Sequence, residues 1–484
     1  MMKPAPYLIA ACAALLLCAF PAFSEPRYPL LERNVRVLES VKDPAYGAPA
    51  PETPPGESLL LDAELCAAMA VSRNPQAAAA AARVEEAESV AGVARSVRKP
   101  QVKAAAAYNY VDGLETEVFG SSLIRTLLNA SDFAPKKGTA TAQIGVEQVL
   151  YAGGQIRAAI RASEYLARAE EWKKQAELIS LAAEARTACY DAMLAGAMIK
   201  VAEDSVAVFE RHLADARNRL DQGMASRFEI LRAETEIRAR ESDLESARTL
   251  ERLALLNLRR ILHLEEDRPV SLAGELPWNP LDTPVGTLVA EALKDRPELM
   301  ALDAAMDAAR ENITVKKGAW LPKAAASLKY QQVAGGGQLA PNGFTVTMGG
   351  EWELYAGGKR KHELAGAEAQ LRGLEQQRAG VARLVETDVR QAHARALEAV
   401  AKIRKEEAAL ALGEEGLSLA ELRFQQGVGI QADTLDAELA LTTAKTGLAK
   451  ALRDYAAALA DLDKALGRGL PAAACDGDGE NPAP

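Results

Sequence analysis

The sequence reads EQVLYAGGQIR at Glu147–Arg157 and EWELYAGGKRK at Glu351–Lys361, so LYAGG occurs twice in one chain of 484 residues. Each copy follows an alternating apolar and polar stretch and precedes a long stretch rich in Ala and charged residues. Two glycines let the backbone turn sharply, which predicts a strand-to-helix joint at each copy. The joint residues are Tyr151, Gly153 and Gly154, and Tyr355, Gly357 and Gly358. An amphipathic tyrosine ring there favours a membrane–water boundary.

The whole chain repeats in the same order. Pro100 corresponds to Pro322 at an offset of 222 residues, and Leu150 corresponds to Leu354 at an offset of 204. The difference leaves 18 additional residues in the first copy, before LYAGG. We therefore expect a tandem duplication, with a first repeat over 59–280 and a second over 281–470.

Each repeat is expected to begin with a helical segment from Leu59 or 281 onward, interrupted at Asn74-Pro75 or Arg296-Pro297. Two strands follow in each repeat, over about 101–111 and 139–151 and over about 322–333 and 343–355. Their residues alternate with period two, so that one face is apolar and the other polar. Ten-residue strands of this kind suit a transmembrane β-barrel, and a half-buried soluble hairpin is the alternative.

Long helices without proline are expected after each LYAGG. They span about 154–222 and 226–263 in the first repeat, and about 358–424 and 431–466 in the second. The longer ones would reach roughly 100 Å at 1.5 Å per residue. Ala and Leu recur at three- and four-residue spacing, as close coiled-coil packing requires. Gly223 and Gly427 are expected to end these helices, since a helix often stops at a left-handed glycine.

Residues 1–24 are expected to be a secretory signal peptide, because a cation precedes a short apolar run and small residues follow it. The sequence leaves open whether Cys18 is lipidated. Residues 25–58 form a Pro-rich extension without a period, and residues 471–484 are expected to be a flexible tail. After the signal peptide the cysteines are Cys66, Cys189 and Cys475, an odd and scattered set that does not read as a disulfide framework. Cys66 and Cys189 are expected to be packed thiols.

The bulk composition argues against nucleic-acid binding and against an enzyme. The net charge is −10 without clusters of Lys or Arg, and aromatic residues make up only 5%. No catalytic, phosphate-binding or zinc motif appears, and the four histidines are not spaced as metal ligands. We therefore expect no catalytic residue, no cofactor and no metal site.

Two strands per repeat give four per chain, which cannot close a barrel. An open strand edge in lipid leaves backbone groups unsatisfied at several kcal/mol each, so several copies must pool their strands. Three copies would supply twelve strands, an even number in the range of outer-membrane barrels.

The duplication, the paired joints and the two helix–turn–helix tips resemble the TolC-type outer-membrane efflux proteins, the outer membrane factor family. The resemblance covers about 59–470. It implies an α+β membrane protein that forms a homotrimer, with a 12-stranded β-barrel in outer-membrane lipid continued by an α-helical barrel of coiled coils through the periplasm. It further implies a passive exit duct of a tripartite efflux or type I secretion system. The implied partners are a periplasmic adaptor (membrane fusion) protein and an inner-membrane pump of RND or ABC type.

By position, Arg219–Glu234 and Arg423–Glu438 resemble the periplasmic tips of that family. The adaptor-contact residues implied are Gly223, Met224, Ala225 and Ser226 in one tip, and Gly427, Val428, Gly429 and Ile430 in the other. Asp433 and Asp436 match the acidic aperture positions and share one helix face at a spacing of three. Three copies would gather six carboxylates, a ring able to select cations.

The chain departs from relatives in which a tyrosine and an arginine tie the tip closed. Phe424 and Gly429 stand at those positions, and Glu229 stands where their acidic partner lies. A closed tip is therefore expected either to be held by another interaction or to be weaker. The alternative function is a periplasmic coiled-coil scaffold or the adaptor itself, although an adaptor should show one helical hairpin flanked by β-segments.

Overall fold

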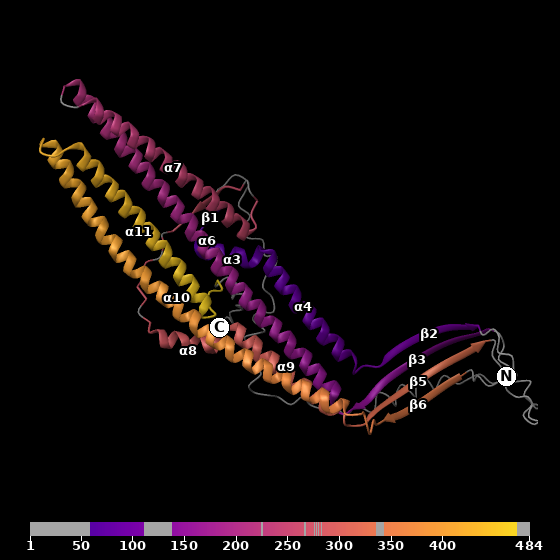
Figure 1. Ribbon diagram of the computed structural model, residues 1–484. Coiled ribbons are helices and arrows are strands. Elements are labelled where there is room, and N and C mark those ends of the chain that lie inside the picture. Colours follow the sequence, from indigo (N-terminus) through magenta and orange to yellow (C-terminus); the bar gives the residue numbers. More distant parts are fainter. Residues whose placement is uncertain are drawn as a thin grey trace, which may run out of the picture. The chain divides into compact units, whose positions relative to one another are not determined.

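The computed structural model describes residues 59–110, 138–223, 226–265, 268–274, 276, 278, 280–281, 283–334 and 343–471 (Figure 1). These residues all belong to one unit, which spans 49–471. The expected signal peptide, the Pro-rich extension, most of the tail and the insert of the first repeat lie outside the described residues.

The two repeats share six corresponding helices and strands. The first has α3 (Ala63–Arg73), α4 (Pro75–Ser96), β2 (Gln101–Tyr110), β3 (Gly138–Ala152), α6 (Gln155–Asp221) and α7 (Arg227–Leu262). The second has α8 (Val285–Asp295), α9 (Pro297–Gly318), β5 (Lys323–Ala334), β6 (Gly343–Glu351), α10 (Lys359–Gln425) and α11 (Gln431–Ala465). The bounds of α3 and α8, of α4 and α9, and of α6 and α10 coincide at the offsets seen in the sequence. Helices α6 and α10 each have 67 residues.

The strand register repeats as well. Gln101 pairs with Glu147 in the β2–β3 hairpin, and Lys323 pairs with Glu351 in the β5–β6 hairpin. These four residues are related by the same two offsets, 222 for the first strand and 204 for the second. The two hairpins are therefore equivalent pair by pair.

One antiparallel sheet combines both hairpins in the order β2-β3-β5-β6. Because register is kept across all four strands, residues of one kind form rows. One row is Val102, Val146, Leu328 and Val346, and the neighbouring row is Gln101, Glu147, Ser327 and Thr347. Side chains alternate between faces along a strand, so one face is apolar and the other polar. Lys103 and Glu147, whose Nζ and Oε2 atoms are 3.3 Å apart, form an ion pair on the polar face.

A bulge near the end of β3 changes which side chains lie on the apolar face. The register between β3 and β5 shifts between Val149 and Tyr151, so Tyr151 pairs with Ala324. One extra residue reverses the alternation, and Tyr151 thereby falls on the apolar face, half exposed.

Strand β6 ends at Glu351, four residues before the expected end at 355. The reason lies in its neighbour, because β5 starts at Lys323, the partner of Glu351. Strand β3, by contrast, continues for five residues after Glu147, the residue that pairs with the first residue of β2. It can do so because β5 pairs with β3 on its other side. In the part of the chain that the structure describes, the residues after Glu351 have no strand left to pair with.

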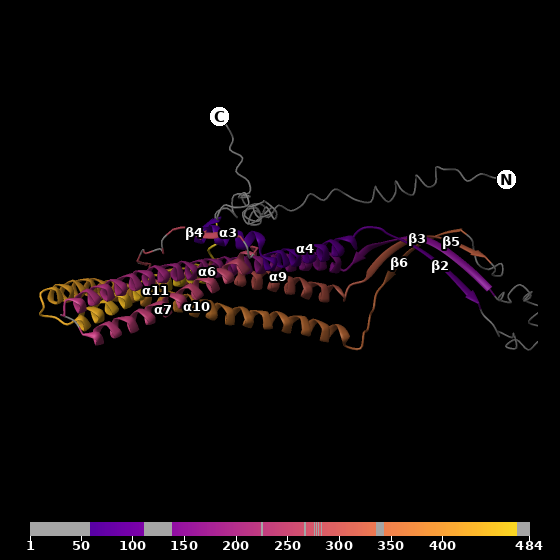
Figure 2. The same cartoon turned by 90° about the horizontal axis from the view of Figure 1, so that it is seen from above.

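The helices form two long antiparallel pairs, α6 with α7 and α10 with α11, which pack against each other through α6 and α11 (Figure 2). Shorter helices flank them: α3 and α4 lie along α6, α8 lies along α10, and α9 contacts both α6 and α10. The Arg186 guanidinium of α6 holds the Glu64 carboxylate of α3 at 2.7 and 2.9 Å and donates to the Gly469 carbonyl at 2.7 Å. This arginine therefore ties the first repeat to the end of the second.

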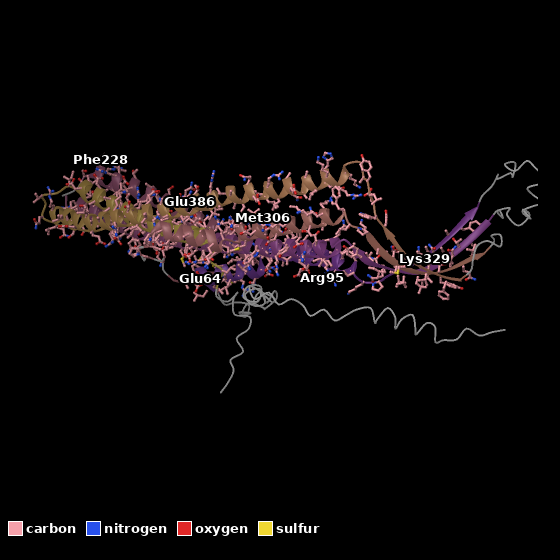
Figure 3. The ribbon with its side chains drawn as sticks, turned by 90° about the horizontal axis from the view of Figure 1, so that it is seen from below. Glu64, Arg95, Phe228, Met306, Lys329 and Glu386 are labelled. Carbon is pink, nitrogen blue, oxygen red and sulfur yellow. The ribbon has the colours of Figure 1, made fainter. Side chains whose placement is uncertain are left out.

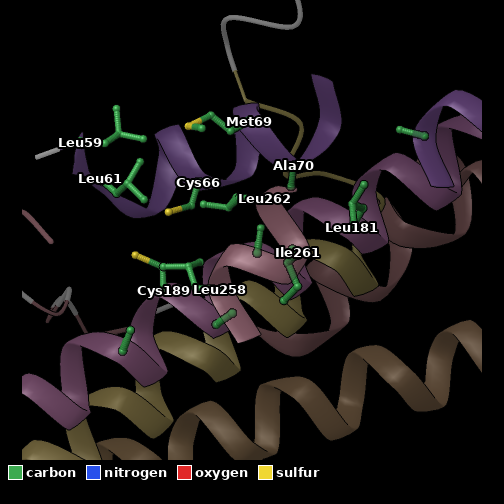
Figure 4. Packing of buried hydrophobic residues seen from close by; sticks show 14 residues of the cluster. Leu59, Leu61, Cys66, Met69, Ala70, Leu181, Cys189, Leu258, Ile261 and Leu262 are labelled. Atoms are coloured by element: carbon green, nitrogen blue, oxygen red, sulfur yellow. The ribbon is translucent and has the colours of Figure 1, made fainter. Parts of the chain in front are cut away.

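The sequence prediction was wrong at the start of the first repeat, where it gave helix from Leu59. Residues Leu59–Leu61 form β1, which pairs in parallel with β4 (Val270–Leu272). Leu59 and Leu61 are buried in a cluster that α3, α6 and α7 complete (Figure 4). Three residues are too few to show a period, and their partner lies about two hundred residues away in the sequence.

A search of the helices within the described ranges found none long and apolar enough to cross a membrane.

The joint between β3 and α6 has one closely packed glycine and one glycine with open space around it. Gly153 and Gly154 both have left-handed backbone conformations, with φ of 59° and 80°. A Cβ on Gly153 would meet the Gly318 carbonyl oxygen at 2.4 Å, whereas a Cβ on Gly154 would meet nothing within 4 Å. Gly154→Ala should cost about 1–2 kcal/mol for the left-handed backbone, and Gly153→Ala should cost about 1–3 kcal/mol more through overpacking.

Thermal midpoints in detergent measure the difference between these matched variants. An equal loss of stability in both would show that the contact with Gly318 contributes nothing.

Candidate functional site

The first helical tip joins α6 to α7 through a glycine and a capped helix start. Gly223 follows α6 with φ of 74°. The Ser226 hydroxyl accepts from the Glu229 N–H at 3.3 Å, and the Glu229 carboxylate accepts from the Ser226 N–H at 3.3 Å. This reciprocal box satisfies two N–H groups that the start of α7 would leave free. Met224 and Ala225, which were predicted to contact the adaptor, lie outside the described residues.

The second tip joins α10 to α11 and exposes apolar side chains. Gly427 has φ of 73°, and the N–H groups of Val428 and Gly429 both donate to the Arg423 carbonyl. Val428 and Ile430 are 70% and 64% exposed. Figure 3 places Phe228, which is also exposed, near the matching end of the first helix pair. The two tips thus present apolar side chains that this chain does not cover.

The predicted acidic residues lie in the first turns of α11. Asp433 and Asp436 are both exposed, and the N-terminal end of a helix favours negative charge. An Asp436 carboxylate oxygen is 3.9 Å from a guanidinium nitrogen of Arg232, which belongs to α7. Asp436 therefore contacts the other helix pair.

A second contact joins the two helix pairs near the tips. The Arg219 guanidinium of α6 lies 4.2 Å from the centre of the Phe424 ring of α10. A cation over an aromatic face is attracted by about 0.5–1 kcal/mol at an exposed site. Phe424 stands where some relatives have a tyrosine that ties the tip closed. In this chain its ring contacts Arg219 of the first repeat instead.

An apolar contact and a buried carboxyl lie in the same helices, close to the contacts between the two helix pairs. Phe209, Ile237 and Leu435 come from α6, α7 and α11 and form one buried cluster. Glu438 of α11 is buried, and its Oε2 atom has no hydrogen-bond partner among the described residues. Burial raises the pKa of Glu438, and the nearby Glu421 also raises it, against Lys445 and Arg211. Because the raised pKa belongs to the folded state, protonation of this carboxyl stabilises the described conformation as the pH falls.

The two joints are related in sequence and differ in their surroundings. Gly357 and Gly358 have φ of 57° and 83°, close to the values at Gly153 and Gly154. Gly153 packs against Gly318 of α9, whereas Gly357 has open space around it. Tyr355 is 86% exposed. The first joint is therefore covered by the second repeat, and no described residue packs against Gly357 in the same way.

Sequence reasoning missed the residues that pack around the second joint. The Trp352 indole N–H donates to the Trp320 carbonyl at 3.1 Å, and the Arg360 guanidinium lies 5.3 Å from the Trp320 ring centre. Arg360 is buried and pairs with the Glu353 carboxylate at 3.4 Å. The available signal was Trp352, two residues before the second LYAGG. Arg219 and Arg232 gave no signal, because arginines fill these helix surfaces.

A comparison with protein families places most of the chain in one of them. The model of the family described as outer membrane efflux protein matches residues 67–262 and 288–468. The outer membrane efflux protein BepC of Brucella suis biovar 1 (strain 1330) is 26% identical over 346 residues, which cover 68% of this chain and 72% of BepC.

Solved channel structures have the same fold. The outer membrane protein VceC of Vibrio cholerae matches with a TM-score of 0.69 at 19% identity, over 84% of this chain and 96% of VceC. The open state of the MtrE outer membrane channel of Neisseria gonorrhoeae matches with a TM-score of 0.66 at 21% identity, over 84% of this chain and 89% of MtrE. The chain belongs to the outer membrane efflux protein family, and it is an exit channel of the outer membrane that extends into the periplasm.

Proposed function

We propose that three copies of the chain close one passive duct, which receives substrates from a periplasmic adaptor and an inner-membrane pump and releases them outside the cell. The observation that carries the proposal is the four-stranded sheet. It has one apolar face, and β2 and β6 each leave one edge without a strand partner among the described residues. Backbone groups on such edges need partners in lipid, and a further copy offers them. The energy for transport comes from the pump, which would be of RND or ABC type.

The duplication predicts how the copies pair. Within the chain, β3 of the first repeat pairs with β5 of the second, and Ile144 faces Tyr330. The repeat offsets relate Ile144 to Met348 of β6 and Tyr330 to Tyr108 of β2. If every hairpin meets the next in one way, Met348 faces Tyr108 of the neighbouring copy. In the same register, β2 of the neighbouring copy also lies opposite the residues after Glu351. It supplies the strand partner that these residues lack among the described residues of one chain.

Cysteine cross-linking tests both the register and the number of copies. Met348 and Tyr108 are exposed, so Met348→Cys combined with Tyr108→Cys should form a disulfide between copies in the outer membrane. A closed ring of three gives covalent species of two and three chains and nothing larger. Non-reducing electrophoresis with a reduced control measures this directly.

The matched control combines Met348→Cys with Ala104→Cys. Ala104 lies on the same face of β2, four residues from Tyr108 and therefore about 13 Å away along the strand. Cross-linking of the control pair instead, a ladder longer than three chains, or no cross-link with either pair would each contradict the closed ring in this register.

The tips are proposed to dock the adaptor and to control the aperture. The proposed adaptor surface consists of the residues at the two tips: Gly223, Met224, Ala225, Ser226, Gly427, Val428, Gly429 and Ile430. The exposed apolar side chains Val428 and Ile430 support this, because exposed apolar side chains gathered at one end of a molecule indicate a partner.

Asp433 and Asp436 are proposed to form a ring of six carboxylates around the aperture. Asp433→Asn with Asp436→Asn should lower the preference for cations over anions, because the ring loses its charge. Reversal potentials in planar bilayers under a salt gradient measure the preference. The control is Asp243→Asn, which removes an equally exposed charge far from the tips. An unchanged reversal potential in the double variant would rule out the ring.

The contacts of Arg219 with Phe424 and of Arg232 with Asp436 are proposed to hold the tip closed. Both join one helix pair to the other, so they are lost when the pairs move apart. Arg219→Ala with Arg232→Ala should remove about 1–2 kcal/mol per chain, which raises the ratio of open to closed conformations roughly 5–30-fold. Single-channel recordings should show longer openings or higher mean current.

Arg238→Ala is the matched control for this pair. Arg238 is exposed on α7 and pairs at 2.7 Å with Glu241 of the same helix, so its removal breaks no contact between helix pairs. An equal increase in current in this variant, or no increase in the double variant, would show that the two contacts do not act as the latch.

A further inference from the structure

Cys66 and Cys189 face each other across the contact between α3 and α6. Cys66 lies in the first turn of α3 and Cys189 in the middle of α6, and neither side chain is exposed to solvent. Both belong to the cluster that contains Leu61, Leu258 and Leu262. Figure 4 shows both sulfur atoms in the space between the two helices, and the two thiols are hydrogen-bonded to each other. The thiols are far apart in the sequence and meet only when α3 docks on α6.

In this structure Cys66 and Cys189 are buried free thiols, as expected, and sulfur at these two places is particular to the first repeat. The repeat offsets relate Cys66 to Leu288 and Cys189 to His393 in the second repeat. Leu288 is buried in the corresponding cluster, where α8, α9, α10 and α11 meet. An ordinary apolar side chain therefore fills the place of Cys66 in an equivalent helix. The first repeat has two thiols where the second has none.

The folded environment makes the pair unreactive as thiols. A hydrogen bond with Cys189 and burial both raise the pKa of the Cys66 thiol far above its ordinary value. The thiolate is the species that attacks a disulfide, so the buried and protonated pair exchanges slowly. The first exchange must therefore occur while α3 is still undocked, and the second must occur as α3 docks on α6 and brings the two sulfur atoms together.

We propose that Cys66 and Cys189 are a modification site, oxidised during folding in the cell envelope to a disulfide that staples α3 to α6. The chain folds outside the cytoplasm, where thiols that lie close together are oxidised rather than kept reduced. The bond encloses residues 67–188, which include α4, β2, β3 and the first part of α6. It restricts the unfolded chain over this long segment, which is the way a disulfide stabilises a fold.

The oxidant is a reactive disulfide of an envelope thiol-oxidising protein. The thiolate of one cysteine attacks a sulfur atom of that disulfide and forms a mixed disulfide. The thiolate of the second cysteine then attacks the cysteine sulfur of the mixed disulfide. The Cys66–Cys189 bond forms, and the oxidising protein leaves as a dithiol that carries the two electrons and two protons.

Peptide mapping of the full chain tests the proposal. Protein made with its own leader is extracted from the outer membrane in detergent and denaturant containing N-ethylmaleimide, and it is digested with trypsin without reduction. We expect the peptide 43–73, which contains Cys66, linked to the peptide 187–200, which contains Cys189. Reduction should release both. The Cys475→Ala variant should give the same linked pair.

Two results would overturn the proposal. One is N-ethylmaleimide on both Cys66 and Cys189 in the protein from the outer membrane. The other is a bond from either cysteine to Cys475, in the peptide 469–484.

Thermal unfolding with and without reductant separates the bond from simple packing. Reductant should lower the midpoint of the parent by about 5 °C, because closing a long loop of the unfolded chain no longer contributes. It should leave the midpoint of Cys66→Ala unchanged, although that variant has also lost packing. A parent that peptide mapping shows to be reduced, and whose midpoint is nevertheless unchanged, contradicts the staple.

Discussion

The pairing of backbone groups at the edges of the sheet is the constraint on which the rest of the structure depends. Each N–H and C=O group of a strand in lipid needs a hydrogen-bond partner, because water is absent there. Among the described residues, β3 and β5 have strand partners on both sides, and β2 and β6 have a strand partner on one side only. The chain therefore supplies part of a wall whose remaining partners belong to other copies.

The duplication makes that constraint easy to satisfy. The two hairpins have the same internal register, and the contact of β3 with β5 shows how one hairpin meets the next. The same holds for the joints, since Gly153 packs against Gly318 within the chain and Gly357 has open space around it. In the first repeat, the joint is covered by the second repeat of the same chain. In the second repeat, the equivalent joint is left for another copy to cover. The long helices extend this arrangement away from the sheet, with alanines at many of their buried positions.

Local patterns in the sequence predicted the elements that have a strong period or a clear stop. Strand β2 begins after Pro100, where the sequence pattern changes from helical spacing to period two. Helix α6 begins after Gly154, where the pattern changes back to helical spacing. Features that depend on distant partners were not predictable in this way. The pair β1–β4 has three residues a strand, and the early end of β6 follows from where β5 begins. The shift of register near Tyr151 appears only when β3 and β5 are paired. The contact between Arg219 and Phe424 joins two repeats, and neither residue differs from its neighbours in sequence pattern.

The mass of the particle that leaves the outer membrane tests the central claim most directly. Native mass spectrometry of the chain extracted from outer membranes in mild detergent should give three copies as the smallest intact assembly. An assembly of three provides a partner for every strand edge described here. A stable single chain that needs no detergent, with its four strands complete by themselves, would contradict the account.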